Sequence, residues 1–269
     1  VGSEMCIRDS IQERMSQWNL EVDIGDVQIP ESAIIDMRPQ TETSSLPKYI
    51  IAIDGSNWEI PLANVPATKV CALQIAGVLI DVARLLSQEE QRTVDPREVS
   101  ASVQNEVYND ILPGSNIATP YEANSVADAW RYHIFNEFSN QRLMADKNSM
   151  TMLDAFWELA KRCGEKRYNE TSDMLKLSRC PNPECEEKNL EIPKECIRCP
   201  GCNIGLFPTD TLRLWEIVSD EGTNNNPLNL HRDVVEQLLL ISMLDHLKNR
   251  APITMGDYAF VMDGPLSLN

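Results

Sequence analysis

Five cysteines lie within 23 residues, in the stretch CPNPECEEKNLEIPKECIRCPGC. Cys180 and Cys185 are separated by four residues, Cys199 and Cys202 by two, and thirteen residues lie between the two pairs. Two short loops that each present two thiolates can close a tetrahedral site around Zn²⁺. The pattern therefore predicts a zinc ribbon over residues 178–208. Four cysteine ligands leave no position for water or substrate, so this zinc would be structural rather than catalytic.

Other interpretations of the cysteines stay open at this point. Cys196 is a fifth candidate ligand, because Cys196 and Cys199 also have C-x2-C spacing; the pair Cys199 and Cys202 is preferred because CPGC forms the better turn. The cluster could instead hold free or redox-active thiols. Cys71 and Cys163 stand in apolar or helical settings and are interpreted as buried thiols. So dense a cluster favours metal binding in a reducing, cytoplasmic compartment over disulfide bonds.

The composition is that of a soluble globular protein. Of 269 residues, 42% are hydrophobic and 24% charged. The 41 acidic residues outnumber the 24 Lys and Arg, which excludes a generic basic coat for nucleic acid but not a local basic groove. No apolar run approaches the ~20 residues of a membrane helix, and no secretory signal opens the chain. A GxxxxGK[ST] loop is absent, which excludes P-loop nucleotide hydrolysis. A GxSxG elbow is absent as well.

Both ends of the chain look unnatural. The first ten residues, VGSEMCIRDS with Cys6, have no continuity with the amphipathic IQERMSQWNLEV that follows, and we expect a non-native leader. The chain stops with DGPLSLN just after an expected strand, so we expect that a C-terminal part is missing. The expected organisation is a leader, a lead-in with the first part of a core, a largely helical insertion, the zinc ribbon and a return to the core: residues 1–10, 11–86, 87–177, 178–208 and 209–269.

Hydrophobic periodicity predicts an alternation of strands and helices. The second apolar segment is expected as a strand in its first half, with a helix as the alternative, and residues 87–120 are polar, with turn signals at LPGSN. Apolar residues at three- and four-residue spacing indicate three helices. The expected elements are a strand at 49–54, the apolar segment 69–86, helices within 122–144, 149–164 and 231–249, and a strand at 258–263.

Two distant segments read almost alike. Residues 49–55 are YIIAIDG and residues 258–264 are YAFVMDG, so each expected strand stops at Asp-Gly. A carboxylate at the end of a buried strand is costly to desolvate unless it is paired or bound to metal. Glycine after it lets the backbone turn and a ligand approach. Asp54 and Asp263 are therefore candidate ligands for Mg²⁺ or Mn²⁺. The alternative is that Asp-Gly is simply a turn dipeptide.

A third carboxylate, Glu236, stands in the strongly apolar run VVEQLLLISML. Arg232 precedes it by four residues, so one interpretation is a surface ion pair worth about 0.3–0.5 kcal/mol. The other is that Glu236 completes a cluster with Asp54 and Asp263. Such a trio suits two-metal phosphodiester hydrolysis, in which the cations activate a water and stabilise the leaving oxygen.

Four motifs in order resemble a bacterial, zinc-ribbon-containing member of the NurA nuclease family: YIIAIDGSNW, CPGC running into LFPTDTLRLWE, RDVVEQLLL and YAFVMDGPLSL. The resemblance covers residues 49–86 and 178–269. It implies an α/β, ribonuclease H-like mixed sheet with helices, interrupted by the helical and zinc-ribbon insertion.

The resemblance also implies an activity. Family members are Mn²⁺-dependent (or Mg²⁺-dependent) DNA nucleases that work with a HerA-type hexameric ATPase in end resection and double-strand break repair, and a homodimer is expected. Asp54 matches the first-strand Asp, Asp263 the later-strand Asp and Glu236 the helix Glu. Further family residues, including a His, lie in a C-terminal portion beyond this sequence.

Two other functions remain open. One is a non-catalytic DNA- or ATPase-binding module in which the ribbon is the contact. The other is a different ribonuclease H-like enzyme that acts on RNA or on integrating elements. Of the remaining polar residues, His133 is interpreted as a packed histidine, His231 and His246 as capping or surface residues, and Asp210 as a cap of a helix or turn.

Overall fold

The computed structural model describes the greater part of the chain after residue 46. The expected leader, most of the lead-in and Cys163 lie outside the described residues. All described residues belong to one compact unit, Leu46–Asn269. No helix among them is long and apolar enough to cross a membrane. The described ranges are 47–86, 103–117, 123–144, 146–161, 173–250 and 252–263.

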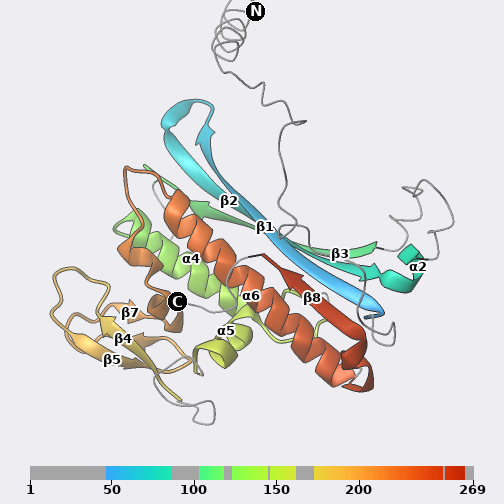
Figure 1. Cartoon of the computed structure of the whole chain (residues 1–269). Helices are drawn as coiled ribbons and strands as arrows, with labels where there is room; N and C mark the ends of the chain where they lie inside the picture. The colour runs from blue at the N-terminus through green and yellow to red at the C-terminus, as the bar shows by residue number, and fades with distance from the viewer. Residues whose placement is uncertain are drawn as a thin grey trace, which may run out of the picture. The chain divides into compact units, whose positions relative to one another are not determined.

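A four-stranded mixed sheet forms the centre of this unit (Figure 1). Its spatial order is β3-β2-β1-β8, in which β1 pairs antiparallel with β2, β2 antiparallel with β3, and β1 parallel with β8. The strands are β1 (Tyr49–Leu62), β2 (Val65–Asp81), β3 (Val103–Pro113) and β8 (Tyr258–Met262). The expected α/β class is therefore confirmed.

Alternation of side chains along the strands decides which face of the sheet is buried. Ile51 and Ile53 of β1 are buried, as are Leu73 and Ile75 of β2. The residues directly before and after each of them are more exposed. β-Branched residues at these positions pack well on a pleated surface. One face of the sheet thus carries the core, and the opposite face includes the exposed side chain of Ile111.

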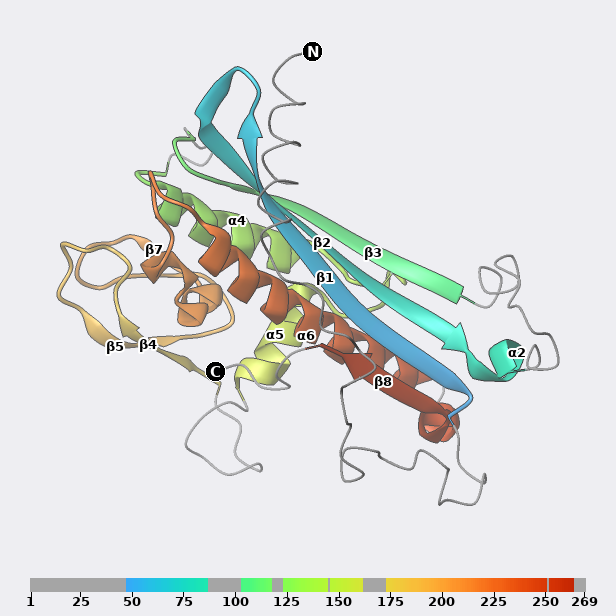
Figure 2. The same ribbon diagram turned by 45° about the horizontal axis from the view of Figure 1, so that its top comes forward.

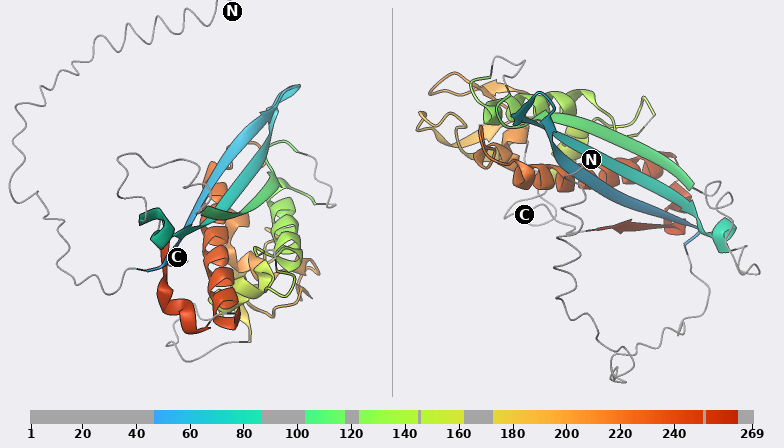
Figure 3. Two further views of the ribbon diagram at one scale, coloured as in Figure 1. Left: turned by 90° about the vertical axis from the view of Figure 1, so that its right-hand side faces the viewer. Right: turned by 90° about the horizontal axis from the view of Figure 1, so that it is seen from above.

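Two helices, α4 (Val126–Asn140) and α6 (Asn225–Arg250), cover the core face of the sheet, and a third, α5 (Met152–Ala160), packs against both of them (Figures 2 and 3). Ser125 begins α4 by accepting a hydrogen bond from the Asp128 backbone N–H. Thr151 begins α5 in a capping box with Asp154. All three expected helices are confirmed. A short helix, α2 (Val82–Leu86), follows β2, so the second apolar segment is a strand over most of its length.

The ribbon has a small hydrophobic core of its own, which includes Leu177, Ile192 and Leu206 beside the buried cysteines. Its two hairpins are β4 (Leu175–Arg179) with β5 (Lys188–Ile192), and β6 (Ile197–Arg198) with β7 (Gly205–Leu206). Single 3₁₀ turns connect the larger elements: η3 (Pro208–Leu212), η4 (Leu214–Glu216) and η5 (Pro252–Asp257).

Two expectations about the strands are wrong. The first strand does not stop at Asp54 but continues to Leu62, because β1 pairs with β2 along its whole length, Asp54 opposite Ala76. Asp-Gly ends a strand only at β8, whose last residue is Met262. In addition, the segment expected as a largely helical insertion contributes β3 to the central sheet. Asp110 on the covered face is buried, whereas Val107 and Ile111 on the open face are exposed, so the usual alternation of apolar and polar residues does not reveal this strand.

Candidate metal centres

The sulfur atoms of Cys180, Cys185, Cys199 and Cys202 all lie within 4.8 Å of one another. Two of the separations are 3.6 Å, between Cys180 and Cys202, and 3.8 Å, between Cys185 and Cys199. A tetrahedron of sulfurs about 2.3 Å from a central Zn²⁺ has edges of about 3.8 Å, whereas a disulfide brings two sulfurs to about 2.05 Å. The four free thiols therefore have the arrangement of zinc ligands. In the described part of the chain this is the only such group.

Backbone donors support the same conclusion. The N–H groups of Asn182 and Glu187 donate to the sulfurs of Cys180 and Cys185, each two residues before the donor. Ile204 does the same for Cys202 and lowers the pKa of that thiol to about 7. Metal ligands must be thiolates, and these donors stabilise negative sulfur. Burial nevertheless raises the pKa of the Cys180 thiol, so we expect the cysteines to lose their protons together with metal binding.

The structure decides between the candidate pairs of the second loop. Cys196 is exposed, its sulfur lies 3.6 Å from the Ile197 carbonyl oxygen, and it is not part of the four-cysteine group. The preferred pair, Cys199 and Cys202, is confirmed. Gly201 is required between them, because a Cβ there would lie 3.2 Å from the Cys185 sulfur and 2.6 Å from the Glu187 side chain.

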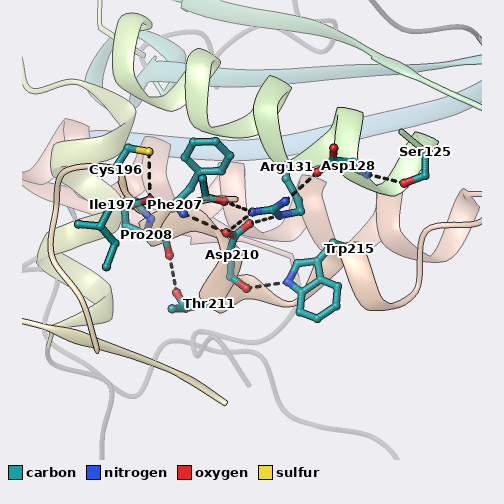
Figure 4. Close-up of polar contacts among 11 residues, drawn as sticks. Ser125, Asp128, Arg131, Cys196, Ile197, Phe207, Pro208, Asp210, Thr211 and Trp215 are labelled. Carbon is teal, nitrogen blue, oxygen red and sulfur yellow. Dashed lines mark hydrogen bonds and ion pairs between the residues drawn. The ribbon is translucent and has the colours of Figure 1, made fainter. Parts of the chain in front are cut away.

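A buried ion pair holds the end of the ribbon against α4 (Figure 4). Nε and Nη2 of Arg131 donate to the two carboxylate oxygens of Asp210, both at 2.8 Å, and Nη2 also donates to the Gly205 carbonyl at 2.6 Å. Asp210 accepts from the Phe207 N–H at 2.9 Å, so the expected capping role is confirmed. The sequence pattern does not predict the ion pair between Arg131 and Asp210. The one indication of it in the sequence is that Arg131 directly follows Trp130, which belongs to the apolar stripe of α4.

The two Asp-Gly segments lie side by side. β1 and β8 pair in parallel with Tyr49 opposite Tyr258, continuing to Ile53 opposite Met262, and the two tyrosine rings stack at 5.0 Å. The next residue on each strand is Asp54 or Asp263, and both are exposed. Two exposed carboxylates therefore follow neighbouring residues at the carboxyl end of a parallel strand pair. Ligands commonly bind at this position in open α/β sheets.

Glu236 reaches the same region from α6. Only 6% of this residue is exposed, and a Cβ at Gly55 would lie 2.5 Å from its Oε1. Burial raises the pKa of Glu236 to about 7, and nearby carboxylates including Asp54 and Asp263 add to the effect, whereas Arg232 opposes it. The contact with Arg232 exists, at 3.4 Å, but an interpretation of Glu236 as a surface residue is wrong.

The three carboxylates are neighbours, but their oxygens are not assembled within 4.8 Å of one another. Ile53 and Gly55 present their side-chain positions to the helices, so Asp54 between them leaves β1 on the opposite face. Within the described residues, β8 pairs with β1 only as far as Met262, which leaves this edge of β1 open beyond Ile53. The donor set suits Mg²⁺ or Mn²⁺ in its chemistry, and a cation would have to draw the carboxylates together.

The histidines have other partners. His133 Nε2 lies 2.7 Å from Asp110 Oδ1, which confirms its packed role, and His246 is a part-exposed neighbour of Asp146 at 4.0 Å. His231 is fully buried 3.6 Å from Asp110 Oδ2, so its expected surface or capping role is wrong. Although burial acts to raise it, these two histidines hold the pKa of Asp110 well below its usual value. This cluster ties α4 and α6 to β3.

Comparison with known proteins adds no relative: no family model, curated protein or solved structure matches the chain.

Proposed function

We propose that this chain is part of a metal-dependent DNA nuclease whose centre consists of Asp54, Asp263 and Glu236. The observation that carries the proposal is the in-register parallel pairing of β1 with β8. This pairing aligns the segments 49–55 and 258–264, which are about two hundred residues apart in the chain, and it puts Asp54 and Asp263 next to each other. A turn dipeptide needs no such partner. The buried Glu236 beside Gly55 supplies the third carboxylate.

The fold supports the same proposal. The first three strands form an antiparallel meander, and the fourth runs parallel to the first after a helical excursion. This is the arrangement expected for the first part of a ribonuclease H-like sheet, and it agrees with the resemblance to NurA nucleases.

Divalent cations at such a centre activate a water and stabilise the leaving oxygen of a phosphodiester. The contribution of the chain is to hold carboxylate oxygens within β1, directly after β8 and on the helix α6. The formal net charge of −17 gives the protein no general attraction for DNA. We therefore propose that DNA reaches the centre through a partner, a HerA-type hexameric ATPase, and through a homodimer, in the cytoplasm. The four cysteines would carry a structural Zn²⁺.

Calorimetric titration with Mn²⁺ tests the centre, on zinc-loaded wild type beside Asp54→Ala and Asp263→Ala. We expect each substitution to weaken Mn²⁺ binding at least about tenfold, because each removes one of few charged ligands, while circular dichroism stays unchanged. Asp257→Ala is the matched control, since it removes an exposed carboxylate at the start of β8 that pairs with Lys48. Unchanged Mn²⁺ binding in both Asp54→Ala and Asp263→Ala would contradict the nuclease proposal. Cleavage of DNA by these variants at the wild-type rate would also contradict it.

A second function is favoured by one specific observation: the cysteines are assembled and the carboxylates are not. The chain would then be a binding module with the ribbon as its contact surface. In that case, fluorescence anisotropy would show binding to a DNA duplex that Mn²⁺ does not alter and that is lost in a Cys199→Ser/Cys202→Ser variant. A Mn²⁺ requirement for DNA cleavage would exclude a purely binding role.

A further inference from the structure

Arg232 lies inside the carboxylate region rather than on a free helix surface. Its stem packs flat on β1, because a Cβ at Gly55 would lie 2.9 Å from Arg232 Cγ and 3.1 Å from Cδ. The same missing Cβ makes room for Glu236 Oε1. Because Gly55 has no side chain, Arg232 and Glu236 of α6 can both pack against β1 at this position. The guanidinium end remains accessible, since 31% of the Arg232 side chain is exposed.

The guanidinium has one close partner, Asp233, and two more distant ones, Glu236 and Asn57. Nη2 donates to Asp233 Oδ1 at 2.8 Å, the usual length of a charge-assisted bond. Nε lies 3.4 Å from Glu236, which is longer than such a bond. Nη1 donates to Asn57 Oδ1 at 3.3 Å, and the amide of Asn57 donates to Asn229 at 3.0 Å. Asp233 and Asn57 therefore fix the guanidinium, and Glu236 is only loosely attached to it.

Charge balance in this region depends on Arg232. Asp54, Asp233 and Asp263 all act on the buried Glu236 with the same sign, and Arg232 alone acts against them. In the described part of the chain it is also the only basic side chain paired with Glu236. The negative carboxylates repel one another, and the positive guanidinium of Arg232 reduces that repulsion. A divalent cation in the same place would do so with twice the charge.

We propose that Arg232 is the resident counter-ion of the carboxylate centre, and that a divalent cation competes with its guanidinium for Glu236. When the cation binds, Arg232 stays attached to Asp233 and Asn57, and Glu236 turns to the metal. The loose contact to Glu236 and the close contact to Asp233 give this exchange its direction. The proposal deepens the nuclease assignment and rests on it, since it requires that the centre binds a divalent cation.

The test is Mn²⁺ calorimetry on the zinc-loaded full chain, with wild type, Arg232→Met, Arg232→Lys and Glu236→Gln, and with the double variant Arg232→Met/Glu236→Gln. Methionine keeps an unbranched stem and removes the charge, whereas lysine keeps the charge. Lys48→Met is the matched control, because it removes one positive charge from an exposed ion pair at the far end of the same strand. Circular dichroism and thermal unfolding of each variant verify that it is folded.

We expect Arg232→Met to bind Mn²⁺ about two- to fivefold more tightly than wild type, the size expected for loss of one part-exposed ion pair. Arg232→Lys and Lys48→Met should bind as wild type does. In the Glu236→Gln background the gain should vanish, because the competed group is gone. Binding in Arg232→Met that equals or is weaker than wild type would overturn the counter-ion role alone. Absence of Mn²⁺ binding from wild type and every variant would overturn that role and the nuclease centre together.

Discussion

The ribbon and the carboxylate centre differ in how far the chain alone assembles them. The four cysteine sulfurs already stand within 4.8 Å of one another. The three carboxylates are close enough to influence one another, but they point from opposite faces of the sheet. The ribbon ligands come from 23 consecutive residues, whereas Asp54 and Asp263 come from opposite ends of the described chain.

The two regions differ in what brings their candidate ligand atoms together. In the ribbon, backbone N–H groups and a glycine in the CPGC turn stabilise the ligand geometry locally. At the other centre, the neighbouring carboxylates act on Glu236 with the same sign and Arg232 opposes them. We therefore expect the carboxylate oxygens to come together only when a cation binds, whereas the ribbon brings its four sulfurs together through local contacts.

The largest expected effect is in the ribbon. Cys199→Ser with Cys202→Ser should remove the bound zinc, and with it a folding contribution on the order of 10 kcal/mol, because metal binding and ribbon folding are coupled. Metal analysis should fall from about one zinc per chain to none, and amide exchange should become fast in β4 to β7 but not in β1 and β2. Cys196→Ser is the control and should keep its zinc. Loss of zinc in that control would contradict the four-ligand assignment.

Next in size is the link between ribbon and helices. Asp210→Asn leaves the buried Arg131 with Asp128 as its remaining carboxylate partner, so we expect the lower end of the loss for a broken buried pair, about 3 kcal/mol in the free energy of unfolding in urea. Arg213→Met also breaks an arginine–carboxylate pair, with Glu216, but the arginine is 57% exposed, so about 1 kcal/mol or less is expected. Equal, small losses in both variants would show that the ribbon is not held to the rest of the unit by this pair.

The smallest effect concerns Glu236 and pH. Its pKa is about 7 in the folded protein, above the ordinary value of 4.5 for a glutamate in water, so the protonated form is favoured on folding. This contribution is fully present below pH 4.5 and is lost as pH rises to about 7. Relative to wild type, Glu236→Gln should therefore gain up to about 3 kcal/mol of stability between these pH values, at 1.36 kcal/mol per pKa unit.

Urea unfolding of both proteins across this pH range measures the difference. Adding Mn²⁺ sharpens the comparison. A cation that binds the carboxylates should stabilise wild type at pH 7.5 and offset the free energy of unfolding that is lost when Glu236 ionises. A flat difference between wild type and Glu236→Gln would mean that Glu236 is solvated, and the contrast between the two centres would then disappear.

Some elements could be read directly from the sequence. The helices at Val126–Asn140 and Met152–Ala160 follow from apolar spacing, and the structure adds their caps, Ser125 and Thr151. The choice of Cys199 with Cys202 follows from turn chemistry within four residues. The strand β3 could not be read in this way, because it buries the polar Asp110 and exposes the apolar Val107 and Ile111. Its hydrogen bonds also come from β2, some thirty residues away in the chain.

The sequence by itself therefore determined the parts whose causes are local: the ribbon and its ligands, the helices, and the two matching Asp-Gly words. Only the tertiary structure decided that these words pair in register, that β1 continues beyond Asp54, and that Glu236, His231 and Arg131 are buried. The physical reason is that burial and charge pairing depend on which distant segment covers a side chain. Arg131 needs Asp210 from the end of the ribbon, and Glu236 needs the space that Gly55 leaves open on β1.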